Sequence, residues 1–313
     1  MKIQQLLENL WKFVEQEGNE PLKYAVNPSI LPFRGSPFGK IKADDIDKKL
    51  KSERADVLWF GSNPNSPDSL HRLLWGKPPK RWNDKNSKEC EEFEDQYKAL
   101  KSSREATQDP WHPTNNPKGW DPIQNPKGGW VHYRNGLAGV LDPKWKDNKY
   151  PPSLSGVIMA NAIPWGSHTL DELLDVLFEF DQELLKKILA FSDQYVAKMI
   201  EALNPKLIIV PLSLARNKTL QKINIYKDDN KQKKHRLLLD ENAAVGKKEA
   251  YEDDKKNDGD KNKRRNFSYF SQQSHGRKWL YVRHPSSLRI PSGAVHNFQD
   301  MLTKVFAANL GSE

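Results

Sequence analysis

Four short apolar runs interrupt an otherwise polar chain. Each is bounded by turn residues, and together they are rich in β-branched side chains. Runs of this length, separated by helical segments, are typical of buried strands in a parallel sheet that is covered on both faces. The runs are DVLWF at 56–60, VIMANAI at 157–163, LIIVPL at 207–212 and WLYV at 279–282.

Helical spacing of apolar residues marks the segments around these strands. The first, Ile3–Glu17, has the pattern of an amphipathic helix. Two more helices are predicted at 169–179 and Gln182–Leu203. The second stops before Asn204-Pro205, because the residue before a proline disfavours the helical conformation. The sequence therefore predicts an α/β fold, with three α/β/α layers around a central, mostly parallel four-stranded sheet.

Two segments depart from this alternation, although we expect residues 1–313 to form a single domain. Residues 66–150 are rich in proline and hold six of the ten tryptophans, which predicts an insertion that forms a pocket wall. Residues 222–278 carry 16 basic and 10 acidic residues, which predicts a charged, partly disordered insertion. Within it, apolar residues at 237–239 and FSYF at 267–270 indicate ordered ends, one interpretation being a hairpin.

Composition narrows the function classes. The single cysteine, Cys90, excludes an internal disulfide and a cysteine-ligated cluster, and the eight histidines lack metal-site spacing, so neither metal nor cofactor is expected. No apolar run is long enough for a membrane span, and the first residues do not resemble a signal peptide. The net charge of +9 favours a polyanionic partner. We expect a cytoplasmic monomer that binds DNA and no membrane.

Polar side chains follow three of the predicted strands. They are Asn63 after the first strand, Asn161 at the second, and His284 after the last. Ligands of open α/β sheets bind beyond the carboxyl ends of the strands, where these side chains would meet. Each motif alone is also ordinary turn punctuation, but three in order favour a functional site.

The motifs G-x-N-P at 61–64 and H-P-S-x-L at 284–288 resemble the two signature motifs of the uracil-DNA glycosylase superfamily. The strand with Asn161 is similar to the base-reading strand of that family. No G-x-G-x-x-G or G-x-x-x-x-G-K-[ST] motif is present, which removes dinucleotide and P-loop alternatives. The resemblance implies a uracil-DNA glycosylase-like fold and excision of a base from DNA.

The resemblance also implies catalytic roles that make chemical sense. His284 would donate a hydrogen bond to the pyrimidine O2 and stabilise the departing anion. Asn63 would orient the attacking water, since an amide cannot act as a general base. Asn161, with an amide donor and an acceptor, suits the Watson–Crick edge of a flipped pyrimidine, either uracil or cytosine.

Further roles concern the base and the duplex. Trp130 or Tyr133, in GGWVHYRNGLAGVL, would stack on the flipped base; alternatively, Trp130 packs its loop against the core. Leu288 stands where the family inserts an apolar wedge into the duplex. Candidates for gripping phosphates are Ser66, Arg283, Ser286 and Arg289.

The base itself is predicted from two departures. Uracil-specific members carry a tyrosine gate against C5 substituents where this chain has Asn65, and the tryptophan-rich insertion supplies extra pocket wall. Both favour a modified pyrimidine, and our expectation is glucosylated hydroxymethylcytosine of phage DNA, in antiphage defence. The alternatives are a uracil or mismatch repair glycosylase and a non-catalytic DNA-binding module. No lysine lies in these motifs, so the enzyme should be monofunctional and form no Schiff base.

Overall fold

The structure is a computed structural model of the 313-residue chain. The residues that it describes are 3–17, 30–32, 55–62, 129–142, 144–145, 154, 156–165, 169–222, 226–228, 231–233, 235–253 and 263–311.

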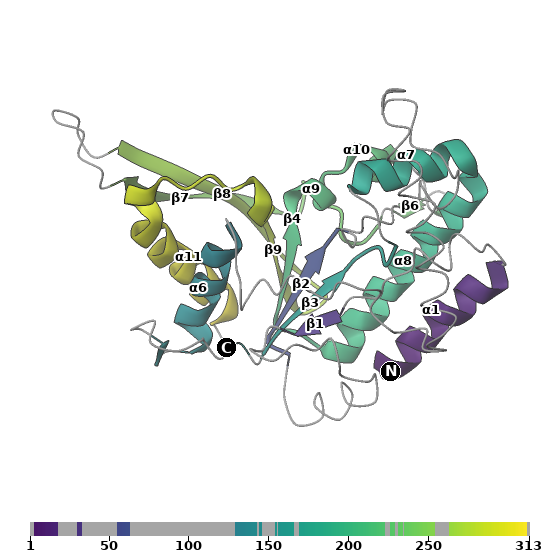
Figure 1. The fold of residues 1–313 in the computed structure, drawn as a ribbon, viewed down its shortest axis with the longest axis horizontal. Helices are drawn as coiled ribbons and strands as arrows, with labels where there is room; N and C mark the ends of the chain where they lie inside the picture. The colour runs from purple at the N-terminus through teal and green to yellow at the C-terminus, as the bar shows by residue number, and fades with distance from the viewer. Residues whose placement is uncertain are drawn as a thin grey trace, which may run out of the picture.

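A seven-stranded sheet is the centre of the described part of the chain (Figure 1). In spatial order its strands are β1 (Ile30–Pro32), β3 (Val157–Asn161), β2 (Val57–Gly61), β4 (Leu207–Pro211), β9 (Arg277–Val282), β8 (Lys263–Ser274) and β7 (Val245–Asp253). The neighbours β3, β2, β4 and β9 run parallel. These are the four strands that the apolar runs predict, so the mixed α/β class and its parallel centre are confirmed.

The predicted count of four strands is too low, because antiparallel strands extend the sheet at both sides. The short β1 pairs with β3, while β8 pairs with β9 and β7 with β8. The β7–β8 hairpin lies inside the segment 222–278 that the charge pattern assigns to an insertion. The aromatic FSYF at 267–270 lies in β8, so it does mark an ordered end and one strand of a hairpin. Strand β7 escapes detection because it is exposed along most of its length and therefore carries charged residues.

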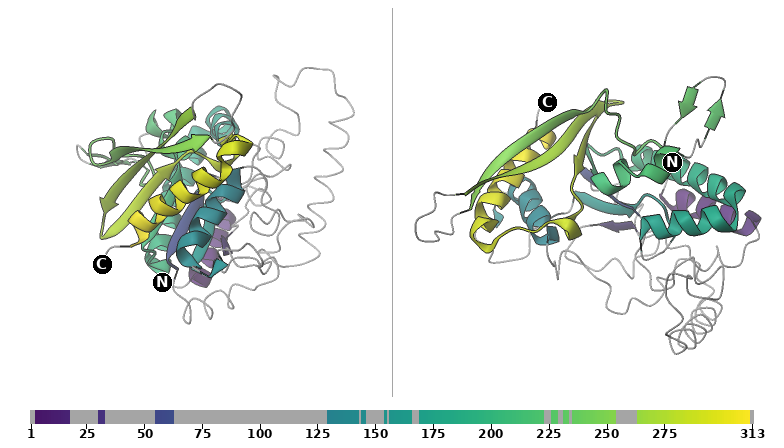
Figure 2. Two further views of the ribbon diagram at one scale, coloured as in Figure 1. Left: turned by 90° about the vertical axis from the view of Figure 1, so that its left-hand side faces the viewer. Right: turned by 90° about the horizontal axis from the view of Figure 1, so that it is seen from above.

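Each face of the sheet carries its own hydrophobic cluster. Alternate residues of β2 point to opposite faces: Leu58 and Phe60 join one cluster, and Val57 and Trp59 join the other. Helices α1 (Ile3–Glu17), α7 (Leu170–Phe180) and α8 (Gln182–Leu203) pack on the first face. Helices α6 (Gly129–Leu141) and α11 (Val295–Leu310) pack side by side on the second (Figures 1 and 2).

Local signals explain where these helices begin and end. The Asp181 side chain accepts hydrogen bonds from the backbone N–H groups of Glu183 and Leu184, which caps α8. Asn204 closes it in the left-handed conformation, with φ 44°. The predicted helices 3–17 and 182–203 are confirmed, and the predicted helix 169–179 is confirmed with a shift of one residue.

Other short elements complete the described part of the chain. They are α9 (Leu212–Ala215), α10 (Lys218–Lys222), β5 (Tyr226–Asp228), β6 (Lys231–Lys233) and the 3-10 turns η3 (Pro285–Ser287) and η4 (Ser292–Ala294). The low-complexity stretch KKNDGDKNKRR lies outside the described residues, except for its last three, which begin β8. No helix in the described ranges is both long and apolar enough to cross a bilayer.

Candidate functional site

Asn161 lies against the backbone of the neighbouring strand. It is the Cα partner of Gly61, and both residues end parallel strands. A Cβ atom placed on Gly61 would lie 2.5 Å from Asn161 Oδ1, so only glycine leaves room for this amide. Beyond the strands, Ala162 N–H donates to the Gly61 carbonyl at 2.9 Å and Ile163 N–H to the Ser62 carbonyl at 3.0 Å. The two loops therefore leave the sheet together.

His284 follows β9 at the same carboxyl edge of the sheet, with β4 between β9 and β2. It is half-buried, and burial lowers the pKa of its imidazole below the usual value. Near pH 7 the ring is therefore neutral, with one N–H donor and one nitrogen acceptor. The carbonyl of His284 accepts a hydrogen bond from the Ser287 hydroxyl at 2.7 Å, which closes the turn η3.

The first turns of α6 hold the His284 segment at several points. Gly129 is so close to the Pro285 carbonyl and to Leu288 Cβ that it has no room for a side chain. The Trp130 ring meets the His284 ring edge-on, with centroids 6.0 Å apart. One turn further, the Tyr133 hydroxyl donates to the carbonyl that precedes His284, that of Arg283, at 2.8 Å. Helix α6 therefore fixes the backbone that carries His284.

The same helix rests on the core beneath the sheet edge. Trp59 of β2 contacts Trp130, with ring centroids 5.3 Å apart, and Tyr133 edge-on at 5.0 Å. Strand β2 therefore supports α6 through packed aromatic rings, and α6 in turn holds His284 in place. Burial raises the pKa of Tyr133 well above its usual value, so its hydroxyl stays a donor.

Trp130 and Tyr133 occupy positions that differ from those expected for base-stacking residues. Tyr133 has no exposed surface, and Trp130 is only 7% exposed; both belong to the core cluster. The alternative interpretation, in which Trp130 packs its segment against the core, describes its observed place. The segment 66–150 was not expected to contain a helix here, because the glycines of α6 obscure its helical pattern.

The candidate DNA contacts divide by exposure. Arg283, which directly precedes His284, and Arg289 are both exposed. Leu288 is 6% exposed within the core cluster, whereas a wedge that enters a duplex must project from the surface. Ser286 lies in η3, and only its backbone is described. The packing roles of Gly61, Gly129 and Ser287 were not expected from the sequence, although Gly61 is the glycine of G-x-N-P and Ser287 the variable position of H-P-S-x-L.

Three predicted site residues lie outside the described residues: Asn63, Asn65 and Ser66. The described segment 55–62 ends at Ser62, next to the predicted water-orienting residue Asn63. Across the described ranges, no three His, Cys, Asp or Glu side chains gather into a metal-binding group.

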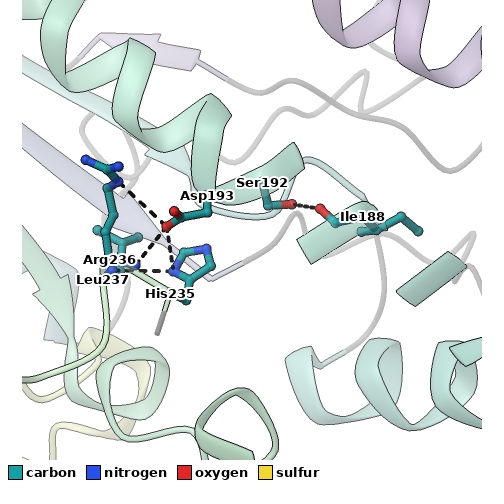
Figure 3. Close-up of polar contacts among 6 residues, drawn as sticks. All are labelled: Ile188, Ser192, Asp193, His235, Arg236 and Leu237. Carbon is teal, nitrogen blue, oxygen red and sulfur yellow. Dashed lines mark hydrogen bonds and ion pairs between the residues drawn. The ribbon is translucent and has the colours of Figure 1, made fainter. Parts of the chain in front are cut away.

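A second polar cluster lies on the other face of the sheet, where His235 and Asp193 are buried and Arg236 is exposed (Figure 3). His235 Nδ1 accepts a hydrogen bond from the Leu237 N–H at 3.4 Å and lies 3.9 Å from Asp193 Oδ1, while its Nε2 is buried without a partner. Burial, aided by Arg236, lowers the pKa of His235 despite the opposing Asp193. Asp193 in turn accepts the Arg236 N–H at 2.7 Å. The cluster anchors this segment to α8.

No family model matches the chain, and neither does any curated protein or solved structure.

Proposed function

We propose that the chain is a monofunctional DNA glycosylase, which flips a modified pyrimidine out of DNA and hydrolyses its N-glycosidic bond. The observation that carries the proposal is the placement of a neutral His284 and of the Asn161 amide at one carboxyl edge of a parallel sheet. A three-layer, uracil-DNA glycosylase-like architecture is part of the same proposal. Helices on both faces of the sheet support it.

The chemistry follows from the charges that bond breaking creates. The C1′–N bond breaks with its electron pair leaving on the base, so the sugar becomes positive and the base negative. A neutral imidazole N–H at His284 donates to the pyrimidine O2 and stabilises this anion. Water attacks C1′ and loses a proton to solvent, and the free base takes up a proton. Asn63 orients that water without removing its proton, which favours a modest rate.

Asn161 would read the flipped base. Its amide presents one acceptor oxygen and one donor group, which match the Watson–Crick edge of a pyrimidine. Because Gly61 lacks a side chain, the Asn161 amide rests directly on the neighbouring strand. Its contact with that strand restricts where a base can bind. Two orientations of the amide fit uracil and cytosine respectively, so Asn161 alone does not select the base.

The proposed substrate is glucosylated hydroxymethylcytosine of phage DNA, and the proposed role is antiphage defence. The support comes from the sequence. Asn65 stands where uracil-specific enzymes carry a tyrosine that blocks C5 substituents, and the tryptophan-rich segment would supply additional pocket wall. Repair of uracil or of a mismatch is the competing function. A second competing function is that of a non-catalytic DNA-binding module, which would not need His284 as a hydrogen-bond donor to a leaving base.

The test is release of a base from three DNAs side by side, with alkali cleavage of the abasic site as readout. The DNAs contain uracil, unmodified cytosine, or glucosylated hydroxymethylcytosine. The proposal expects breaks in the glucosylated DNA only after alkali, and none with His284→Ala. A matched control is His296→Ala, which removes an exposed histidine on α11. Release from uracil alone would assign repair; silence on all three, or cleavage without alkali, would contradict a monofunctional glycosylase.

A further inference from the structure

The β7–β8 hairpin projects past the sheet as a two-stranded ribbon. Strand β8 pairs with β9 only from Phe270 to Ser274, whereas it pairs with β7 from Lys263 to Ser271. Because Phe270 is the partner of Tyr281, the last residue but one of β9, residues 263–268 extend beyond the carboxyl edge that bears His284. Six residues of strand correspond to roughly 20 Å.

One face of this ribbon is covered, and the other is not. Tyr251 and Phe267 pack on Phe298 of α11, with ring centroids 5.0 and 5.6 Å apart. The alternate residues of β8, Arg264, Asn266 and Ser268, are exposed. Viewed from above, α6 and α11 lie on one side of the curved ribbon, and no other described element covers its outer side (Figure 2).

The uncovered face has the chemistry of a nucleic-acid surface. Cross-strand partners on it are Arg264 with Glu252, Asn266 with Ala250, and Ser268 with Lys248. The face therefore carries two cations, two neutral hydrogen-bonding side chains and one carboxylate, so its net charge is positive. Between Arg264 and Ser268 small residues keep the face flat, and this stretch lacks the large apolar side chains that anchor protein partners. At its base, Phe270 lies under the Arg216 guanidinium, 4.4 Å from the ring centroid.

Dimensions select the groove. Paired strands lie about 4.8 Å apart, and with side chains such a ribbon fits the major groove, about 12 Å wide, but not the minor groove, about 6 Å wide. The span from Arg264 to Ser268 is about 13 Å, close to four base-pair rises. Arginine, asparagine, serine and lysine are also the side chains that donate to base edges and phosphates in that groove.

We propose that the outer face of the β7–β8 ribbon docks in the major groove of duplex DNA beside the flipped base, through Lys248, Arg264, Asn266 and Ser268. The inference rests on the proposed function in taking DNA as substrate, and it adds that the substrate is double-stranded next to the reacting base. Glu252 weakens this contact.

The experiment combines binding and footprinting on the full-length protein. The probe is a short duplex with one tetrahydrofuran abasic-site analogue, which fixes the position of the bound protein. Dimethyl sulfate methylates guanine N7 in the major groove, so protection of N7 reports whether that groove is occupied. The test variant is Lys248→Ala/Arg264→Ala. The control, Lys198→Ala/Lys206→Ala, removes the same charge from the last turns of α8 and from the residue before β4, which is at the amino edge of the sheet.

We expect wild type and control to protect guanines to one side of the analogue. The test variant should lose this protection and bind about tenfold more weakly or worse, since each base contact contributes roughly that much discrimination. Base release by saturating enzyme should change little. Glu252→Gln should bind more tightly, a gain that misfolding cannot produce.

Several results would overturn the inference. They are absence of N7 protection with wild type, undiminished protection with the test variant, equal weakening in the control, and no gain from Glu252→Gln. Release of the base is measured separately, so a glycosylase with an idle ribbon and a DNA binder without activity give different results.

Discussion

Replacing Gly61 by alanine should disable the proposed site while leaving the fold intact. The added Cβ would lie 2.5 Å from Asn161 Oδ1, and real Cβ contacts essentially never fall below 3.0 Å, so the amide must move by at least 0.5 Å. The obstacle is the end of a side chain rather than backbone. Gly61 also does not have positive φ, so alanine meets no backbone strain there.

The two effects differ in size. Alanine in a strand gains about 0.5–1 kcal/mol over glycine, and moving Asn161 off its rotamer costs about 0.5–1.5 kcal/mol. The free energy of unfolding should therefore change by less than about 1 kcal/mol. Displacing a substrate-positioning group by 1 Å costs about 10²-fold in rate, so base release should fall about 10- to 100-fold.

Single-turnover base release and urea unfolding measure these quantities together. The control is Gly156→Ala, because its Cβ would also lie 2.5 Å from one side-chain oxygen, Asp56 Oδ2, but before the start of β3, at the other end of the same strand pair. That variant should keep the rate, with a similarly small change in stability. A wild-type rate for Gly61→Ala would refute the role given to the Asn161 amide. A rate loss matched by a large loss of stability would show that the effect is structural.

Three further variants probe the packing described above. Tyr133→Phe removes the hydrogen bond to the Arg283 carbonyl, so it should cost about 1 kcal/mol and slow base release; an unchanged rate would contradict the role of α6. Leu288→Ala should cost about 2–4 kcal/mol in urea unfolding, and a change near zero would show that Leu288 is exposed, as a wedge would be. Burial lowers the pKa of His235 in the folded protein, so the unfolded state binds the proton first as the pH falls. The free energy of unfolding should therefore decrease below about pH 6.5, and His235 can account for at most about 1.4 kcal/mol per pH unit of this decrease. In the variant His235→Gln the free energy of unfolding should depend less on pH. An unchanged pH dependence would show that it comes from other groups.

The buried centre of the fold is readable in the sequence because it is encoded by continuous apolar runs. All four parallel strands come from runs such as LIIVPL, whose residues are buried on both faces in β4. The capped helix α8 is equally clear, since its start and its end both carry local signals. These features need no knowledge of distant contacts.

Strand β7 and helix α6 could not be predicted because their sequences lack such continuous apolar runs. Strand β7 alternates little, because most of its residues are exposed on both faces, and its charge resembles that of a mobile insertion. Helix α6 is obscured by Gly129, Gly136 and Gly139, each of which is needed for close approach to another element. Tertiary contact explains these glycines, and the sequence pattern alone cannot.

The candidate site was predictable in its position but not in its support. Asn161 and His284 follow from strand ends and motifs. The roles of Trp130 and Tyr133 depend on which way α6 faces, and this direction comes from packing on Trp59. An aromatic residue near a motif can therefore support the backbone of a candidate site instead of lining the site itself.

The most direct test of the proposed function is mass spectrometry of the small molecules released from phage DNA that contains glucosylated hydroxymethylcytosine. Wild-type protein should release the free glucosylated base, and His284→Ala should release none above background. Release of a nucleoside or nucleotide, or equal release by both proteins, would contradict hydrolysis of the N-glycosidic bond at His284.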